Sequence, residues 1–272
     1  MEINNLLQTK FFVPSVRNNL VTRDRLVKHV EQNIHRKLTL ICAPAGFGKT
    51  TLLAEWLKQT NSKYTWLSLD EQDNELSRFW LYLITAIAKI TPPHLEITTT
   101  HLQNQELNFE SLLTPLINQL ANLTEDIVII LDDYHLIDDR EIHQSFDFFL
   151  NHIPPQLHFV IATRSDPPLP LAKLRARGEL TELRIQELRF NSEEIQIFTN
   201  EIMEINLSAL QISTLKTKIE GWIAGLQMAG LSLQQCGDTT AWIDSLQGNN
   251  RYTWDYLTEE VLQQQPEEIK AF

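Results

Sequence analysis

The sequence predicts an α/β fold in which a parallel, five-stranded sheet is flanked by helices and is followed by a small helical domain. Five short apolar or β-rich runs recur along the first 190 residues, and segments with helical periodicity separate them. Strands that alternate with helices favour a parallel sheet with right-handed crossover connections. Beyond Phe190 the strand-like runs stop, and helix-start signals take their place.

The expected strands cover residues 38–42, 64–69, 127–131, 158–163 and, more weakly, 180–185. The first, third and fourth runs are almost continuously hydrophobic, which is typical of parallel strands covered on both faces. Between the strands, the spacing of apolar residues from Leu52 to Leu57 and from Phe79 to Ile90 predicts two amphipathic helices. Each strand is therefore expected to be followed by a helix that returns the chain to the same edge of the sheet.

The helical domain is predicted from its helix starts. Asn191 with Glu194, and Ser208 with Gln211, have the spacing of capping boxes, and apolar residues flank both pairs. A third apolar helix is expected over residues 222–235. We therefore predict a first domain over residues 1–190 and a helical domain over residues 191–255. Residues 256–272 keep a helical period around Pro266 without a Gly or Asn stop signal, so we expect an element that is cut within a longer protein.

Composition excludes several classes of protein. The chain has 272 residues, 43% hydrophobic and 21% charged, which is enough to bury a core. It lacks an apolar run of the roughly 20 residues that span a bilayer, and its first residues lack a secretory signal, so we expect a cytoplasmic protein without a membrane segment. Its two cysteines, Cys42 and Cys236, give neither a disulfide framework nor zinc spacing. The net charge of -12 disfavours direct binding of nucleic acid.

The run APAGFGKTT follows a predicted strand and opens a predicted helix, which is the setting of a phosphate-binding loop in P-loop NTPases. Glycines let the backbone curl so that its N–H groups point at phosphate oxygens, a Lys reaches the β and γ phosphates, and a hydroxyl binds Mg²⁺. The pattern begins with Gly, and this chain has Ala there; the alternative is a plain strand-to-helix turn with an exposed Lys. The candidate nucleotide-binding residues are Ala43, Pro44, Ala45, Gly46, Phe47, Gly48, Lys49, Thr50 and Thr51.

Charged residues follow two other expected strands, at the rim where α/β sheets bind ligands. Asp132 is expected to hold Mg²⁺ together with Thr50, and Asp133 to orient or deprotonate the attacking water. Arg164 is expected to contact the γ phosphate. The alternatives are a solvated acidic turn for the aspartates and an ion pair with Asp166 for the arginine.

The remaining histidines and tryptophans give weaker signals. The histidines lack HExxH or other ligand spacing, so each is interpreted as a surface or core residue. No basic groove accompanies the tryptophans, which are interpreted as packing residues rather than as a base-stacking platform: Trp66, Trp80, Trp222 and Trp242.

Six segments together resemble the ATPase module of the large LuxR-type transcriptional regulators, the group that includes the maltose-regulon activator, within the STAND class of signal-transduction ATPases. The similarity extends over essentially the whole chain, and the segments that carry it occur in the family's order: TKFFVPSVRNNLVTRDRL, APAGFGKTTLLAEWL, WLSLDEQDNELSRFWLYLITAI, VIILDDYHLI, TRSDPPLPLAKLRARGELTELRIQELRF and GWIAGLQMAGLSL. The resemblance implies a switch that ADP keeps closed and monomeric, that ATP and an inducer open for self-association, and that slow hydrolysis resets. It tolerates Ala43 as the first loop residue.

The resemblance also implies roles for residues outside the loop. Arg23 and Arg25 fall in a stretch that lies near adenine in the family, as neighbours of the base or ribose. Arg175 and Arg177 match as well, either as phosphate contacts or in a salt bridge that holds the helical domain. Residues 256–272 correspond to the start of a truncated winged-helix segment. DNA binding is expected only in a C-terminal region beyond this sequence.

Two other functions remain open on the sequence alone. The first is a scaffold that binds ATP or ADP without hydrolysing it and acts through protein contacts. The second is a P-loop enzyme that works on nucleic acid, which predicts a basic channel that the acidic composition disfavours.

Overall fold

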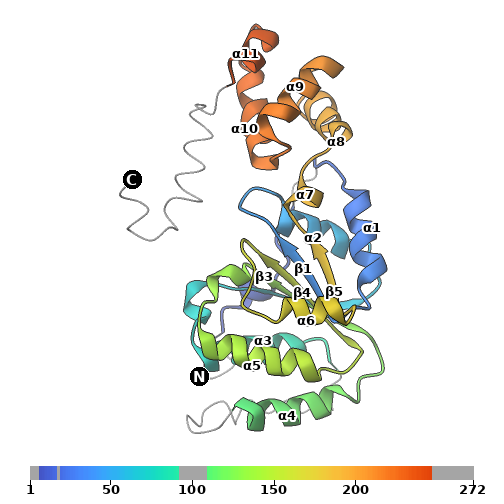
Figure 1. The fold of residues 1–272 in the computed structure, drawn as a ribbon, viewed down its shortest axis with the longest axis vertical. Coiled ribbons are helices and arrows are strands. Elements are labelled where there is room, and N and C mark those ends of the chain that lie inside the picture. Colours follow the sequence, from blue (N-terminus) through green and yellow to red (C-terminus); the bar gives the residue numbers. More distant parts are fainter. Residues whose placement is uncertain (1–5, 17–18, 92–108, 247–272) are drawn as a thin grey trace.

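The computed structural model describes residues 6–16, 19–91 and 109–246 (Figure 1). Its centre is a five-stranded sheet in the order β2-β3-β4-β1-β5, in which every neighbouring pair is parallel. The predicted fold class, a parallel five-stranded sheet flanked by helices, is confirmed. The strands are β1 (Leu38–Cys42), β2 (Lys63–Ser68), β3 (Ile127–Asp132), β4 (Leu157–Thr163) and β5 (Leu180–Leu183).

Helices cover both faces of the sheet (Figure 1). Alternate residues of a strand point to opposite faces, so that in β3 Ile129 packs with one cluster of buried side chains and Val128 with the other. Helices α1 and α2 contribute to the Val128 side, and α3, α4, α5 and α6 to the Ile129 side. Their bounds are α1 (Asp24–Asn33), α2 (Lys49–Leu57), α3 (Leu76–Ala88), α4 (Phe109–Leu120), α5 (Arg140–His152) and α6 (Leu171–Ala176).

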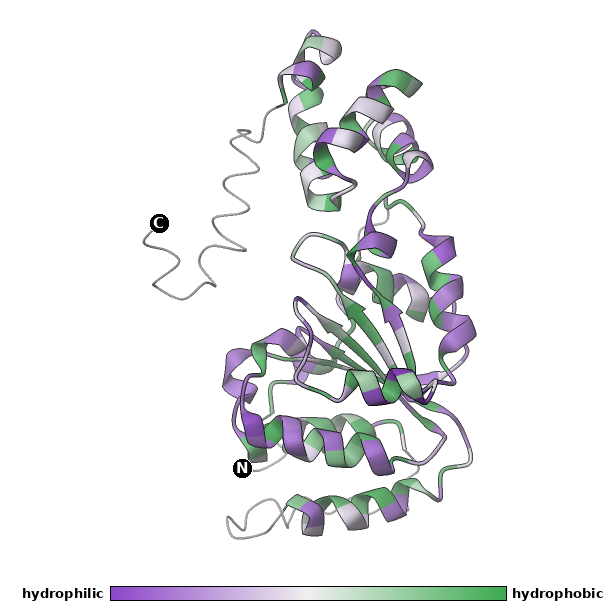
Figure 2. Ribbon diagram, viewed as in Figure 1, coloured by the Kyte–Doolittle hydropathy of each residue, from purple (hydrophilic) through white to green (hydrophobic). Residues whose placement is uncertain are grey.

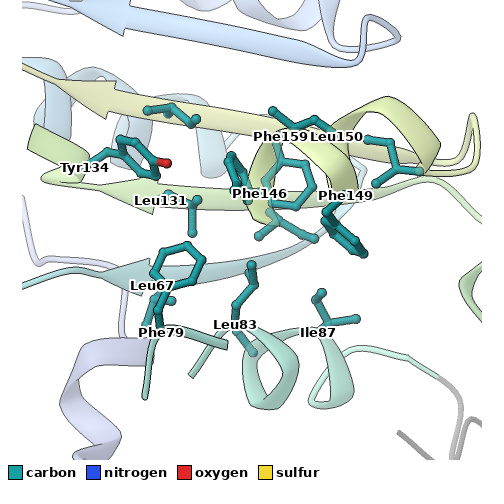
Figure 3. Close-up of a cluster of buried hydrophobic side chains, with 14 of the residues drawn as sticks. Leu67, Phe79, Leu83, Ile87, Leu131, Tyr134, Phe146, Phe149, Leu150 and Phe159 are labelled. Atoms are coloured by element: carbon teal, nitrogen blue, oxygen red, sulfur yellow. The ribbon is translucent and has the colours of Figure 1, made fainter. Parts of the chain in front are cut away.

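The central strands are buried along their whole length. Every residue of β1, β3 and β4 is buried, which accounts for their continuous hydrophobic sequences. Figure 2 shows the hydrophobic colour concentrated in these strands and hydrophilic residues on the outer sides of α1 and α5. On the α3 and α5 face, aromatic rings such as Phe79, Phe146 and Phe159 fill the space between helices and sheet (Figure 3).

A short N-terminal segment packs beside β2 and α3. Its helical turn η2 (Gln8–Phe11) carries Lys10, which is buried. The ammonium group of Lys10 contacts the carboxylates of Asp70, at 2.9 Å, and of the fully buried Asp73. Arg78 of α3 donates to Asp73 at 3.2 Å, and the Lys10 ammonium lies 4.5 Å from the centre of the Tyr82 ring. We call these five residues the Lys10 cluster.

A helical segment follows the sheet. A short helix, α7 (Ile185–Leu188), leads from β5 into this segment, whose apolar residues form their own cluster of buried side chains. Both predicted capping boxes are present: Asn191 exchanges side-chain and backbone hydrogen bonds with Glu194, and Ser208 does so with Gln211. The helices are α8 (Ser192–Gln196), a π-helical turn (Ile197–Ile202), α9 (Ala209–Ile219), α10 (Ile223–Leu233) and α11 (Thr239–Ser245).

The division into domains at residue 190 stays a prediction, and the expected winged-helix start at residues 256–272 lies outside the described residues. Within the described part of the chain, none of the helices is long and apolar enough to cross a membrane.

Candidate nucleotide-binding site

The predicted phosphate loop lies between β1 and α2, at the carboxyl edge of the sheet. Gly46 and Gly48 have φ of 79° and 70°, a left-handed conformation that glycine adopts without the steric cost of a Cβ. Ala43, the departure from the usual pattern, is not among the described residues with positive φ, and its N–H donates to the Thr163 carbonyl at 3.2 Å. The loop therefore does not require glycine at position 43.

Lys49 begins α2 and is buried. Its ammonium group donates to the carbonyl oxygens of Ala43, at 2.7 Å, and Pro44, at 3.1 Å. Burial lowers the pKa of Lys49, and the positive charge of Arg164 lowers it further. Within the described residues, no carboxylate comes within ion-pair distance of this ammonium. The positive charge of the Lys49 ammonium therefore lies at the loop without an ion pair to a carboxylate of the described residues.

Thr50 and Asp132 meet across the site. β3 ends at Asp132, whose buried carboxylate accepts hydrogen bonds from the Thr50 hydroxyl at 2.9 Å and from the Asp133 backbone N–H at 3.1 Å. Burial, together with the charge of Asp133, raises the pKa of Asp132 to about 6. A bound cation would relieve this penalty, because it favours the ionised carboxylate.

The Thr50 and Asp132 oxygens suit Mg²⁺, which binds hard oxygen ligands and usually takes one or two carboxylates plus waters and substrate phosphates. The described residues contain no group of three or more His, Cys, Asp or Glu side chains that could hold a metal by themselves. The pair therefore fits a cation that shares its coordination with a phosphate ligand, and does not fit a metal site built by the protein alone.

Asp133 follows the strand in a left-handed conformation with φ of 58°, which is uncommon outside glycine but tolerated by Asp. Its side chain is 43% exposed, in contrast to the buried Asp132. The two acidic neighbours thus have different surroundings, as the predicted division between a metal ligand and a water-activating group requires.

His135 lies beside these groups and was interpreted from the sequence only as a surface or core residue. Its Nδ1 is 3.8 Å from an Asp133 carboxylate oxygen. Both ring nitrogens are buried without a hydrogen-bond partner. Burial lowers the pKa of His135 to about 4, and the charges of Arg164 and Lys49 act in the same direction, so the ring is neutral near pH 7. Its position two residues after Asp133 is the only sequence signal that could have indicated it.

Arg164 directly follows β4, and its charge depresses the pKa values of both Lys49 and His135, which places its guanidinium near the phosphate loop. Asp166, the alternative partner expected for Arg164, accepts a hydrogen bond from Arg184. The position of Arg164 is therefore compatible with the expected phosphate contact.

Arg23 and Arg25 are placed at the connection to the helical segment. The buried Arg23 donates to the carbonyls of Phe47 in the phosphate loop, at 3.2 Å, and Leu188, at 2.6 Å. Burial lowers the pKa of Arg23 to about 10. Arg25 donates to the Glu187 and Arg189 carbonyls and pairs with Glu194 at 3.0 Å. The role of both arginines near the base or ribose stays a prediction.

Arg175 pairs with Glu182 of β5 at 2.7 Å. This exposed ion pair lies within the sheet region and does not join it to the helical segment.

Trp222 also reaches the phosphate loop. Its indole N–H donates to the Ala45 carbonyl at 3.0 Å, and the Ala224 N–H donates to the Gly46 carbonyl at 3.0 Å. The sequence alone predicts a packing residue at Trp222, because a hydrogen bond across 177 positions leaves no local sequence signal.

Comparison with known proteins finds relatives over almost the whole chain. The chain is 38% identical over 270 residues to the HTH-type transcriptional regulator MalT of Yersinia pestis, and 37% identical to MalT of Yersinia enterocolitica. The matches cover 98% of this chain and 30% of each relative. This chain is similar to part of a MalT-type regulator. The predicted resemblance to the ATPase part of LuxR-type regulators is thereby confirmed, although no family model matches the chain.

Solved structures agree on the fold. The Walker-type ATPase PABY2304 of Pyrococcus abyssi has a TM-score of 0.54 at 14% identity, over 94% of this chain and 77% of that one. The STAND protein PH0952 of Pyrococcus horikoshii, which has a tetratricopeptide repeat sensor, has a TM-score of 0.53 at 18% identity, over 95% of this chain and 34% of that one. Both support a P-loop ATPase fold.

Proposed function

We propose that this chain is the ATP-binding module of a MalT-like transcriptional regulator, a switch that ADP and ATP control and that slow hydrolysis resets. The observation that carries the proposal is the convergence of Lys49, Thr50 and Asp132 at one point on the carboxyl edge of the sheet. A buried ammonium that no carboxylate of the described residues pairs with, together with a hydroxyl–carboxylate pair, suits a phosphate with its Mg²⁺.

The residues around this point then take distinct roles. Lys49 exchanges its bonds to the loop carbonyls for bonds to the β and γ phosphates. Thr50 and Asp132 hold Mg²⁺, which neutralises phosphate charge when bound. Asp133 orients or deprotonates the attacking water, with the neutral His135 beside it, 3.8 Å from an Asp133 carboxylate oxygen. Arg164 contacts the γ phosphate and distinguishes ATP from ADP.

The proposal covers the nucleotide switch and no more. Because the chain spans about 30% of the length of the MalT proteins it matches, inducer recognition and DNA binding are not assigned to it. Self-association in the ATP state is proposed as the output of the switch. The net charge of -12 also argues against direct nucleic-acid binding by this chain.

The first test purifies the chain without added nucleotide, denatures it, and identifies the nucleotide that is released. We expect ADP from the parent and none from Lys49→Ala. Lys58→Ala is the matched control, because Lys58 is an exposed residue at the other end of the same helix. If the parent releases nothing and also fails to bind added ATP with Mg²⁺, the proposal is wrong.

The second test separates the switch from a scaffold that does not hydrolyse ATP. Single-turnover hydrolysis of γ-labelled ATP is expected for the parent and is expected to be lost in Asp133→Asn, while ATP binding persists. Binding without any turnover in the parent would instead identify the chain as a nucleotide-gated scaffold.

A further inference from the structure

The phosphate loop has an outer wall that comes from the helical segment. Residues 221–224 form a turn that opens α10, with Trp222 at its N-terminal cap. Two successive carbonyls of the loop accept hydrogen bonds from this turn: Ala45 from the Trp222 indole, and Gly46 from the Ala224 backbone, each at 3.0 Å. We call residues 221–224 the wall turn.

The loop and the wall turn are in direct contact. A Cβ on Gly46 would lie 2.5 Å from Trp222 Nε1 and 2.6 Å from Ala224 Cβ. A Cβ on Gly48 would lie 3.2 Å from the Ile223 side chain. Glycine at position 46 is therefore required both by its φ of 79° and by the close approach of the wall turn.

The wall turn is itself held in place. Gly221 has φ of 70°, and its carbonyl accepts a hydrogen bond from the Phe190 N–H at 2.9 Å. Gly225 makes room for the indole, since a Cβ there would lie 2.5 Å from Trp222 Cε3. The position of the indole is thus fixed by α10, which packs against its ring, and by the phosphate loop, which accepts a hydrogen bond from its N–H.

These contacts bear on the chemistry of the loop. In a trans peptide the C=O and the N–H point in opposite directions. When the Ala45 and Gly46 carbonyls bond to the wall turn, the N–H groups of the same two peptides, which belong to Gly46 and Phe47, point to the opposite side. A concave row of backbone N–H groups binds anions such as phosphate.

We propose that the wall turn is part of the phosphate-binding site and that Trp222 is a positioning residue, which orients the loop N–H groups for a nucleotide phosphate. The inference rests on the proposed function and adds to it a residue from outside the sheet. Binding is reciprocal: nucleotide affinity depends on the docked wall turn, and bound nucleotide holds the wall turn against the loop.

The first experiment measures MgADP affinity by calorimetry in the 272-residue chain carrying Trp222→Phe. Loss of one hydrogen bond to the loop is expected to weaken binding about three- to tenfold. Trp80→Phe is the matched control, because the Trp80 indole also donates one hydrogen bond, to Ser145 at 2.9 Å, on the opposite face of the sheet. We expect Trp80→Phe to lower the melting temperature and to keep the parental affinity.

A second pair of variants displaces the indole without removing it. Gly225→Ala pushes the ring away from α10 and is expected to weaken MgADP binding, although Ala is the better helix former. Gly230→Ala makes the same change in the same helix, away from Trp222: the added Cβ would lie 3.0 Å from the end of the flexible Met203 side chain and 3.4 Å from the Phe198 ring. This control is expected to bind MgADP as the parent does.

The outcomes separate the two proposals. If both Trp222→Phe and Gly225→Ala bind MgADP within twofold of the parental affinity, the role of Trp222 is overturned and the proposed function still stands. A parent that binds no nucleotide would overturn both. If Trp222→Phe does not fold, Gly225→Ala decides the question alone.

Discussion

Among the residues that the structure describes, two lysines are buried, and the two regions that hold them treat the charge differently. Lys10 and Lys49 are 5% and 8% exposed. In the Lys10 cluster, the ammonium lies against the carboxylates of Asp70 and Asp73. In the phosphate loop, the ammonium of Lys49 donates to the carbonyl oxygens of Ala43 and Pro44 and has no ion pair with a carboxylate of the described residues.

This difference separates a structural charge from one held ready for a ligand. Burial of an ionised group carries a large desolvation penalty unless a partner of opposite charge offsets it. The Lys10 cluster contains its own counter-charges, so its ion pairs attach the N-terminal segment to the turn at residues 70–73 before α3 and need nothing from outside. Lys49 has a pKa that burial and Arg164 lower, and an anionic ligand would offset this penalty. Because the charge of Lys49 is not paired in the folded chain, its interaction with an anion can contribute to the free energy of ligand binding.

The largest expected effect on folding comes from Asp73→Asn. This change removes a fully buried carboxylate from Lys10 and Arg78 and leaves only Asp70 to neutralise the Lys10 ammonium. Breaking a buried ion pair leaves an uncompensated charge, so we expect the free energy of unfolding to fall by about 3 kcal/mol. Urea denaturation measures this loss. MgADP affinity should not change, and a parallel loss of affinity would show that the two regions are coupled.

Lys49→Met is expected to give the opposite result. The variant removes a charge that folding does not use, so the free energy of unfolding without nucleotide should change by less than about 1 kcal/mol. A ligand at 100 times its Kd stabilises a protein by about 2.7 kcal/mol. The parent should show this gain with MgADP in a thermal melt, and Lys49→Met should show none. A large loss of stability without ligand would mean that Lys49 is structural, as Lys10 is.

Asp132 is a buried charge of the opposite sign, and its effect on stability depends on pH. Because its pKa is raised from 3.8 to about 6, the folded chain binds more protons than the unfolded chain between these values. The free energy of unfolding should therefore fall as pH rises from about 4 to about 6, by on the order of 2 kcal/mol. Asp132→Asn removes this dependence, so the variant should be more stable than the parent at pH 8 in the absence of Mg²⁺ and nucleotide. If the difference in unfolding free energy between the parent and Asp132→Asn were the same at pH 5 and at pH 8, the raised pKa of Asp132 would be contradicted.

The same carboxylate gives the opposite pH dependence to ligand binding. Mg²⁺ requires the ionised form, so MgADP affinity should decrease as pH falls below about 6. Calorimetry at pH 5 and pH 7.5, with the measured heats corrected for buffer ionisation, measures this difference in affinity.

The sequence predicted what local patterns encode. Apolar or β-rich runs located every strand within two residues of its observed ends. The runs of β1, β3 and β4 are continuously hydrophobic because these strands are buried on both faces. The Asn191 and Ser208 capping boxes were equally accessible, since each device is complete within four residues. The phosphate loop was recognisable because its glycines and Lys49 lie in one short run.

Contacts between distant segments were beyond this kind of prediction. The strand order β2-β3-β4-β1-β5 and the bond from Trp222 to Ala45 join segments whose sequences show no trace of each other. His135 was missed because a buried histidine without partners has the same sequence signature as a core histidine. Arg25 lay near adenine in the family pattern, but its hydrogen bonds in the structure go to the connection with α8. The roles of the site residues remain predictions until nucleotide binding is measured.

The smallest expected effect calibrates the comparison, and it comes from an ion pair that is not buried. Lys63 and Glu125 form a contact in which the side chains are 51% and 59% exposed. Glu125→Gln makes the same kind of change as Asp73→Asn, removing the charge of a lysine's partner while keeping its shape. Water replaces the lost partner at an exposed site, so the free energy of unfolding should change by less than about 1 kcal/mol. Equal losses of unfolding free energy for Glu125→Gln and Asp73→Asn in urea would show that burial does not account for the stability of the Lys10 cluster. The difference between Lys10 and Lys49 would then rest only on the number of carboxylates beside each ammonium.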